Sequence, residues 1–227
     1  MSSGLFKPPR VNRKDLTSGN KYLIIVVSLI DTKGSDEMTT AKRDYDSVDF
    51  RISELEELTR PVHPVMPKHL WSETLPNLWQ GGTLDRWAGD EWGSQGLGIG
   101  KKITPSTFDC VYTLYADAEP VSWFVKELRF GFYDGAMDDF APEEDLLDIV
   151  KMAHKDWKSG KKVLIRCQAG LNRSGLVMAL VLIRDGYTPA DAIRLMREKR
   201  SPAVLCNTMF TRWLLTLSDE QLATWRN

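Results

Sequence analysis

The sequence predicts an α/β fold in which helices flank a central, mostly parallel sheet. Two observations lead to this prediction. Segments typical of short strands at 77–82, 108–116 and 161–166 occur among segments typical of helices, and the last of these strands runs through a tight loop into an apolar helix at 174–186. With 227 residues, of which 42% are hydrophobic, the chain can build one sizeable core.

We expect an N-terminal extension over 1–64, partly disordered, followed by the main domain over 65–227. In the extension, the apolar run YLIIVVSLI at 22–30 is shorter than the roughly 20 residues that a membrane-spanning helix needs, so we predict a buried strand and no membrane span. The acidic segment 47–60 predicts a short helix with Ser53 as its cap.

The main domain begins with two predicted strands. The first, NLWQGG at 77–82, ends in a glycine turn, and the second, FDCVYTLYA at 108–116, alternates β-branched and aromatic residues. An amphipathic helix follows at 142–160, where acidic residues at the start complement the helix dipole and Gly160 ends the helix. The apolar face of this helix consists of Leu146, Ile149, Val150, Ala153 and Trp157.

The remainder of the chain is predicted to be mainly helical. A short apolar strand at 161–166 precedes the helix at 174–186, which is apolar almost all round and therefore buried. Thr188 begins a further helix. Asn207 caps a helix that extends to about 217, and Ser218 with Gln221 caps a last short one.

The composition disfavours several classes of protein. A net charge of −1 gives no support for general nucleic-acid binding. The three cysteines, Cys110, Cys167 and Cys206, are an odd number at wide spacing, which argues against a disulfide framework and favours a reducing compartment such as the cytoplasm. Because no CxxC pair occurs and none of the three histidines lies near a cysteine, we expect no metal site, and we expect no cofactor.

The segment RCQAGLNRSG at 166–175 carries the pattern that points to chemistry. A strand that enters a tight loop and then a helix gathers backbone N–H groups around one point, and such a nest binds a tetrahedral anion. Gly170 permits a backbone angle that a side chain resists, and Arg173 adds a planar fork for two phosphate oxygens. The side chain of Asn172 either braces the loop, positions water or has no role. The predicted phosphate-binding residues are Gln168, Ala169, Gly170, Leu171, Asn172 and Arg173.

Cys167 lies at the end of the strand, in the centre of the positive field of the helix N-terminus, which favours a thiolate. A thiolate there can attack phosphorus in line and form a cysteinyl-phosphate. Ser174 is placed to hydrogen-bond the sulfur and so to make it a better leaving group when water cleaves the intermediate. The alternative is a buried cysteine that packs beside a glycine turn, but this leaves the spacing of glycine, arginine and serine unexplained.

The C-x5-R-S motif within VLIRCQAGLNRSG (163–175) resembles that of the cysteine-dependent protein tyrosine phosphatases, most closely the compact dual-specificity group. The order of LPNLWQGG (75–82), FDCVYTLYA and REKRSPAVLCNTMF (197–210) is also similar to that family, so the resemblance covers roughly 70–217. It implies a phosphatase-type strand–CX5R loop–helix within a phosphatase domain over 65–227. The implied reaction is hydrolysis of phosphotyrosine in proteins, with phosphoserine and phosphothreonine left open.

The same family carries an aspartate on a loop before the cysteine, which protonates the leaving oxygen and then activates water. Three candidates lie in RFGFYDGAMDDF at 129–140. Asp134 follows the apolar FGFY, which resembles the end of a strand, and precedes Gly135, so it is our first choice for the catalytic acid. Asp138 ranks second and Asp139 third.

Arg166 stands where the family usually has a histidine whose ring braces the loop. If the side chain points toward the loop, its charge favours the thiolate but the hydrogen bonds of the ring are lost. If it points away, the backbone alone holds the geometry. We expect an effect on rate rather than on reaction type, and we expect Arg166→His to keep or raise activity.

Other functions stay open on the sequence alone. A pseudophosphatase, a non-catalytic module that binds phosphate or phosphopeptides, would keep the loop and Arg173 but lack a competent acid. A rhodanese-like sulfur-transfer domain fits the acid loop and the C-terminal helices poorly. The loop holds no lysine, which disfavours phosphoinositide substrates. The N-terminal extension is a candidate for docking a partner.

Overall fold

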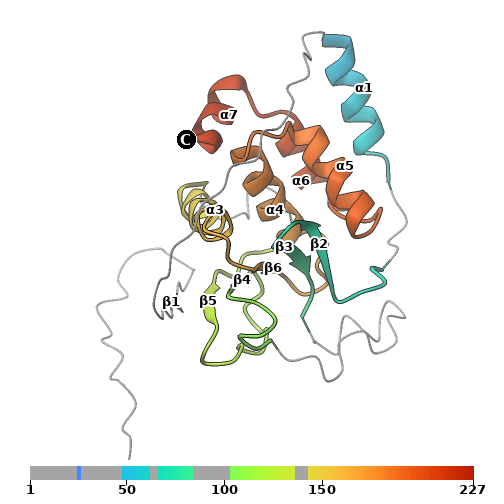
Figure 1. The fold of residues 1–227 in the computed structure, drawn as a ribbon. Helices are drawn as coiled ribbons and strands as arrows, with labels where there is room; N and C mark the ends of the chain where they lie inside the picture. Colours follow the sequence, from blue (N-terminus) through green and yellow to red (C-terminus); the bar gives the residue numbers. More distant parts are fainter. Residues whose placement is uncertain (1–24, 27–47, 62–65, 84–102, 136–142) are drawn as a thin grey trace, which may run out of the picture.

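The computed structural model describes residues 25–26, 48–61, 66–83, 103–135 and 143–227 (Figure 1). Six strands form one sheet in the order β1–β5–β4–β6–β3–β2. The three central pairings, β3–β6, β6–β4 and β4–β5, are parallel and the two outer pairings are antiparallel, which confirms the predicted mostly parallel sheet. The strands are β1 (Ile25–Val26), β2 (Trp71–Leu75), β3 (Leu78–Gly81), β4 (Cys110–Thr113), β5 (Lys126–Arg129) and β6 (Val163–Arg166).

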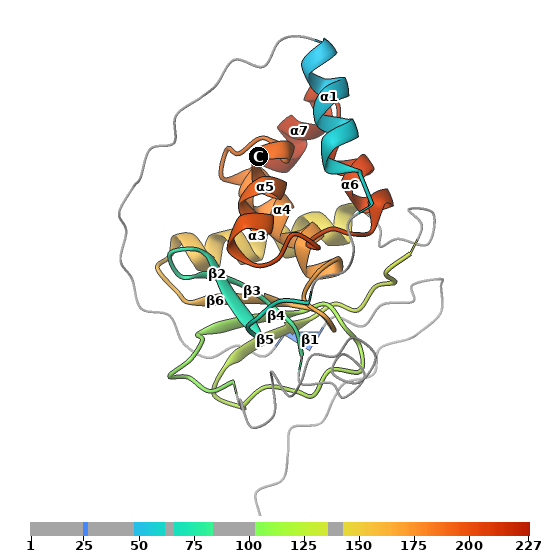
Figure 2. The same ribbon diagram turned by 90° about the vertical axis from the view of Figure 1, so that its right-hand side faces the viewer.

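Figures 1 and 2 show helices α3 to α7 gathered on one side of the sheet. Every residue of α4 from 174 to 183 is buried, as its sequence predicts. In the part of the chain that the structure describes, no helix has the length and apolar character that crossing a bilayer requires. The helices are α1 (Val48–Leu58), α3 (Glu143–Lys158), α4 (Arg173–Arg184), α5 (Pro189–Lys199), α6 (Thr208–Leu215) and α7 (Asp219–Arg226).

The helix ends in the C-terminal part follow the predicted capping signals. The side chains of Thr188 and Asn207 each accept a hydrogen bond from a backbone N–H in the first turn of the helix that follows. Ser218 and Gln221 form a reciprocal capping box. The prediction for α1 is wrong in one detail, since Ser53 lies inside this helix rather than at its start. Because the helix begins at Val48, Ser53 lies in its middle, so the preference of serine for capping positions did not decide where the helix starts.

The part of the N-terminal extension that the structure describes is attached to the main domain. Two residues of the predicted strand at 22–30 form β1, which pairs antiparallel with β5 at the edge of the sheet. Helix α1 packs near α5, where Arg194 forms ion pairs with Glu54 and Glu57 at 2.8 and 2.9 Å. Leu58 is buried in the main apolar core. The rest of the extension, including residues 1–24 and 27–47, lies outside the described residues.

The register of the central strands brings their carboxyl ends to one edge of the sheet. Gly81 of β3 and Thr113 of β4 both pair with Arg166, the last residue of β6. The residue after β6 therefore enters the space beyond the middle of the sheet, which is the usual place for a ligand in an open parallel sheet. β5 ends at Arg129, so the segment FGFY at 130–133, predicted to end a strand, follows the strand instead.

Candidate active site

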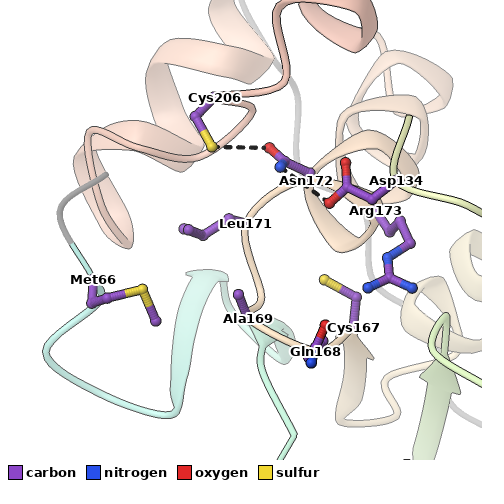
Figure 3. Close-up of a pocket in the computed structure, with 9 residues that line it drawn as sticks. All are labelled: Met66, Asp134, Cys167, Gln168, Ala169, Leu171, Asn172, Arg173 and Cys206. Carbon is purple, nitrogen blue, oxygen red and sulfur yellow. Dashed lines mark hydrogen bonds between the residues drawn. The ribbon is translucent and has the colours of Figure 1, made fainter. Parts of the chain in front are cut away.

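Cys167 follows the central strand β6, and its backbone N–H donates to the carbonyl oxygen of Gly81 at 3.2 Å. Residues 167–172 then lead into α4, which begins at Arg173. The predicted strand–loop–helix arrangement is thus present, and its loop lines a pocket. Figure 3 shows the pocket, whose walls are formed by Met66, Asp134, Cys167, Gln168, Ala169, Leu171, Asn172, Arg173 and Cys206.

Several donors around this pocket lack a partner. Among the described residues, the backbone N–H groups of Ala169, Gly170, Leu171 and Asn172 have no acceptor. The Nε of Arg173 is buried and also has no hydrogen-bond partner there. Because buried N–H groups are nearly always paired, this cluster of donors calls for an acceptor-rich ligand.

The side chain of Arg173 is held from two sides. Its Nη1 donates to the carbonyl oxygen of Phe132 at 3.3 Å, and its guanidinium lies over the ring of Tyr115 at 5.0 Å from the centroid. These contacts fix the guanidinium beside Cys167, as Figure 3 shows. The arginine is therefore preorganised rather than free in solvent.

The turn in the loop depends on Gly170. Its φ of 72° lies in the left-handed region that disfavours side chains. A Cβ at this position would also collide with the backbone of Gly81 and with the guanidinium of Arg200. Both the conformation and the close packing therefore require glycine here, as predicted.

Arg166 points away from the loop. Its Nε donates to the Thr113 hydroxyl at 2.8 Å, and its Nη2 donates to the Glu119 carbonyl at 2.7 Å and to the Glu127 carboxylate at 3.0 Å. The side chains of Arg166 and Glu127 are only 6% and 8% exposed. Burial lowers the pKa of the Arg166 guanidinium, and the charge of Glu127 offsets part of that effect. Of the two orientations that the sequence left open, the structure has the second.

The loop is nevertheless braced by side chains, which come from two residues that the sequence did not mark. Arg200, just beyond α5, donates from Nε to the carbonyl oxygen of Gly170 at 2.6 Å and from Nη2 to that of Ala169 at 3.3 Å. Gln80, in β3, donates from Nε2 to the same Gly170 oxygen at 3.2 Å. The expectation that the backbone alone holds the geometry is therefore wrong.

Asp134 lies at the rim of the pocket between two asparagine side chains. The Nδ2 of Asn172 donates to one carboxylate oxygen at 3.1 Å, and the Nδ2 of Asn207 donates to the other at 3.0 Å. Asn172 thus links the loop to the predicted acid, which favours a bracing role over none. Asp138 and Asp139 lie outside the described residues.

No group of three or more potential metal ligands occurs within the described ranges. All three cysteines are free. Cys206 donates to the Oδ1 of Asn172 at 3.4 Å, and burial raises the pKa of its thiol. Cys206 is therefore a packed neighbour of the loop in this structure.

Comparisons with known proteins find similarity in the part of the chain that holds this loop. Residues 124–220 match the family described as dual specificity phosphatase, catalytic domain. A mouse putative dual specificity phosphatase has a similar fold (19% identity, TM-score 0.50, 73% of this chain and 91% of that one). So does the tyrosine phosphatase OH1 of Orf virus (17% identity, TM-score 0.53, 73% and 95%). Residues 124–220 are therefore similar to the catalytic domain of dual-specificity phosphatases, and the two solved structures share the fold of the chain.

The sequence similarity to curated relatives covers only a segment of the chain. Human protein tyrosine phosphatase type IVA 3 is 38% identical over 73 residues, which are 32% of this chain and 42% of that protein. A probable type IVA B enzyme of Dictyostelium discoideum is 36% identical over 81 residues, 35% of this chain and 50% of that protein. The chain therefore spans half or less of the length of these relatives.

The orientation of Arg166 predicts an effect on stability. Replacing Arg166 with alanine or histidine removes its buried bond to Glu127, although Arg129 still pairs with that carboxylate at 3.0 Å. We therefore expect a cost of about 2 kcal/mol of unfolding free energy. The expectation that Arg166→His keeps or raises activity concerns a different quantity and stays a prediction. Urea unfolding measures the change. As a control, Arg194→Ala breaks the pairs of an arginine whose side chain is 36% exposed, and is expected to cost no more than about 1 kcal/mol. Equal stability of the Arg166 and Arg194 variants would contradict this interpretation.

Proposed function

We propose that the chain is a phosphomonoester hydrolase that works through a cysteinyl-phosphate intermediate, as a protein tyrosine or dual-specificity phosphatase. One observation carries the proposal. Among the described residues, the backbone N–H groups of 169–172, in the loop that follows Cys167, lack acceptors, as does the Nε of Arg173. A phosphate dianion supplies several acceptor oxygens and negative charge at one point, which is what this set of donors fits.

In the first step, the thiolate of Cys167 attacks phosphorus. The sulfur lone pair forms the S–P bond while the ester P–O bond breaks and its electron pair moves to the leaving oxygen. Asp134, in its protonated form, donates a proton to that oxygen. The loop N–H groups and Arg173 bind the phosphoryl oxygens, whose charge is spread in the transition state.

In the second step, water attacks the phosphorus of the cysteinyl-phosphate. The Asp134 carboxylate takes a proton from the water, so the acid returns to its starting form. The S–P bond breaks and its electron pair returns to sulfur. Ser174, whose Oγ lies 3.3 Å from the Sγ of Cys167, then donates a hydrogen bond to the thiolate that leaves. Inorganic phosphate is the product.

The lining of the pocket supports substrates with a single phosphate on an apolar body. Met66, Ala169 and Leu171 provide apolar surface, and Arg173 is the only cation that lines the pocket within the described ranges. A phosphorylated tyrosine side chain matches this combination, whereas a headgroup with several phosphates requires more positive charge. We therefore propose phosphotyrosine in proteins as the substrate, with phosphoserine and phosphothreonine as further candidates.

The remaining parts of the proposal rest on the sequence. A thiol nucleophile requires a reducing environment, which supports a cytoplasmic location. The near-neutral charge supports a protein rather than a nucleic-acid partner. Docking of a partner by the N-terminal extension stays a prediction, because most of that segment lies outside the described residues.

The nucleophile can be tested with p-nitrophenyl phosphate in the presence of a metal chelator. We expect hydrolysis by the wild type and none by Cys167→Ser, because a hydroxyl at this position is far less ionised than a thiol. Cys206→Ser serves as the matched control and should retain activity. Turnover that survives Cys167→Ser would exclude the cysteinyl-phosphate route. A wild type that binds a phosphopeptide without hydrolysing it would instead be the pseudophosphatase.

The acid can be tested by varying the leaving group. Asp134→Ala is expected to lower kcat for a phosphotyrosine peptide by about 10²–10⁴-fold, the usual contribution of a general acid. The loss should be smaller for p-nitrophenyl phosphate, because p-nitrophenolate leaves more readily without a proton. Asp138→Ala and Asp139→Ala are the matched controls. A full loss in either control, with Asp134→Ala unaffected, would reassign the acid.

A further inference from the structure

Ser174 contacts two polar side chains, that of Gln80 in the buried interior and that of Cys167 in the wall of the pocket. Its Oγ lies 3.3 Å from the Nε2 of Gln80 and 3.3 Å from the Sγ of Cys167. Gln80 and Ser174 are both fully buried. Among the described residues, the Ser174 hydroxyl has no other hydrogen-bond partner, so its single proton has only one possible acceptor, the sulfur.

The orientation of the Gln80 amide follows from its other contact. The same Nε2 donates to the carbonyl oxygen of Gly170 at 3.2 Å, and a carbonyl can only accept. The opposite orientation of the amide would place two oxygens against each other. The group that faces Ser174 is therefore an NH2, which donates and cannot accept.

These constraints determine where the Ser174 proton goes. Since Gln80 donates to the Oγ of Ser174, the serine proton is available to Cys167. A thiolate accepts this proton as a hydrogen bond, and every hydrogen in the chain from Gln80 to Cys167 is then paired. With a neutral thiol, either the S–H donates to Ser174 and the buried serine proton is left without an acceptor, or the sulfur accepts that proton only weakly. Both arrangements are less favourable than the one with a thiolate.

The residue type at position 80 is difficult to explain by packing. The Oε1 of Gln80 is buried and has no partner among the described residues, which is a cost that an apolar side chain would avoid. The Gly170 carbonyl does not need Gln80, because Arg200 bonds it at 2.6 Å. What Gln80 alone supplies is the donor to Ser174.

We propose that Gln80 is a positioning residue that directs the Ser174 hydroxyl toward Cys167, favouring the thiolate for attack and for departure. This inference rests on the proposed function, but it concerns the state of the sulfur and can be measured without turnover. No proton is transferred in this role. When the S–P bond breaks, its electron pair returns to a sulfur that already faces a hydrogen-bond donor.

The test is the pH dependence of iodoacetamide alkylation of Cys167 in the full chain, followed by mass spectrometry. In Gln80→Met, which keeps the size of the side chain but removes the donor, we expect the midpoint to rise by about one pH unit, since one such unit corresponds to about 1.4 kcal/mol and a hydrogen bond to a charged group contributes a similar amount. Gln80→Leu repeats the test if the methionine variant is poorly folded, and circular dichroism checks both.

A double-mutant cycle separates this role from bracing. In a Ser174→Ala background, Gln80→Met should no longer move the alkylation midpoint, because the side chain that relays the effect is absent. An equal shift in both backgrounds would overturn the proposal and leave Gln80 as a brace. An unchanged midpoint in Gln80→Met, with the wild type still hydrolysing phosphate esters, would also overturn it. A wild type without hydrolysis would refute the proposed function, whereas the midpoints would still decide the role of Gln80.

Discussion

The hydrogen bond from the Nε of Arg200 to the carbonyl oxygen of Gly170, 2.6 Å long and buried, is the contact on which the geometry of the site depends. It holds the loop at its turn, where a positive φ and the lack of room for a Cβ exclude other residues. With loop carbonyl groups bonded by Arg200 and Gln80, the N–H groups without acceptors remain for a ligand. The anion binding that we propose at this edge of the sheet therefore depends on Arg200, a side chain that does not line the pocket.

Two buried arginines, Arg166 and Arg200, have different kinds of partner. Arg166 faces the carboxylate of Glu127, so its charge is balanced on the side of the sheet away from the loop. Arg200 bonds neutral oxygens within the described ranges, and burial lowers its pKa to about 10, an effect that the charge of Cys167 partly offsets. Arg200 thus stays charged at neutral pH. Arg166, next to the cysteine in the sequence, thus pairs within the sheet, whereas Arg200, distant in the sequence, bonds the loop.

Sequence periodicity predicted the strand at 161–166 and the buried helix at 174–186 because both patterns depend on neighbours along the chain. The braces of the loop were not predictable in this way. Gln80 lies 90 positions in sequence from the Gly170 carbonyl that it bonds, and Arg200 lies 30 positions from it. Arginine is ordinarily exposed, so nothing in the sequence indicated that Arg200 lies in the interior. The direction of Arg166 likewise depends on a carboxylate 39 positions earlier. Gln80, a polar residue inside the predicted strand NLWQGG, was the one signal in the sequence that could have pointed to a brace.

The predicted acid, Asp134, is joined to the loop after Cys167 through Asn172. The Nδ2 of Asn172 donates to Asp134, and its Oδ1 accepts from the backbone N–H of Asn207 at 2.9 Å. Asn207 donates to the other oxygen of the same carboxylate. An ionised Asp134 can accept from both amides, but a protonated one carries a hydrogen on one oxygen and favours only one of them. Protonation of Asp134 therefore weakens one of the two hydrogen bonds that it accepts from the asparagine side chains. When the weakened bond is the one from Asn172, protonation also loosens the contact between Asp134 and the loop after Cys167.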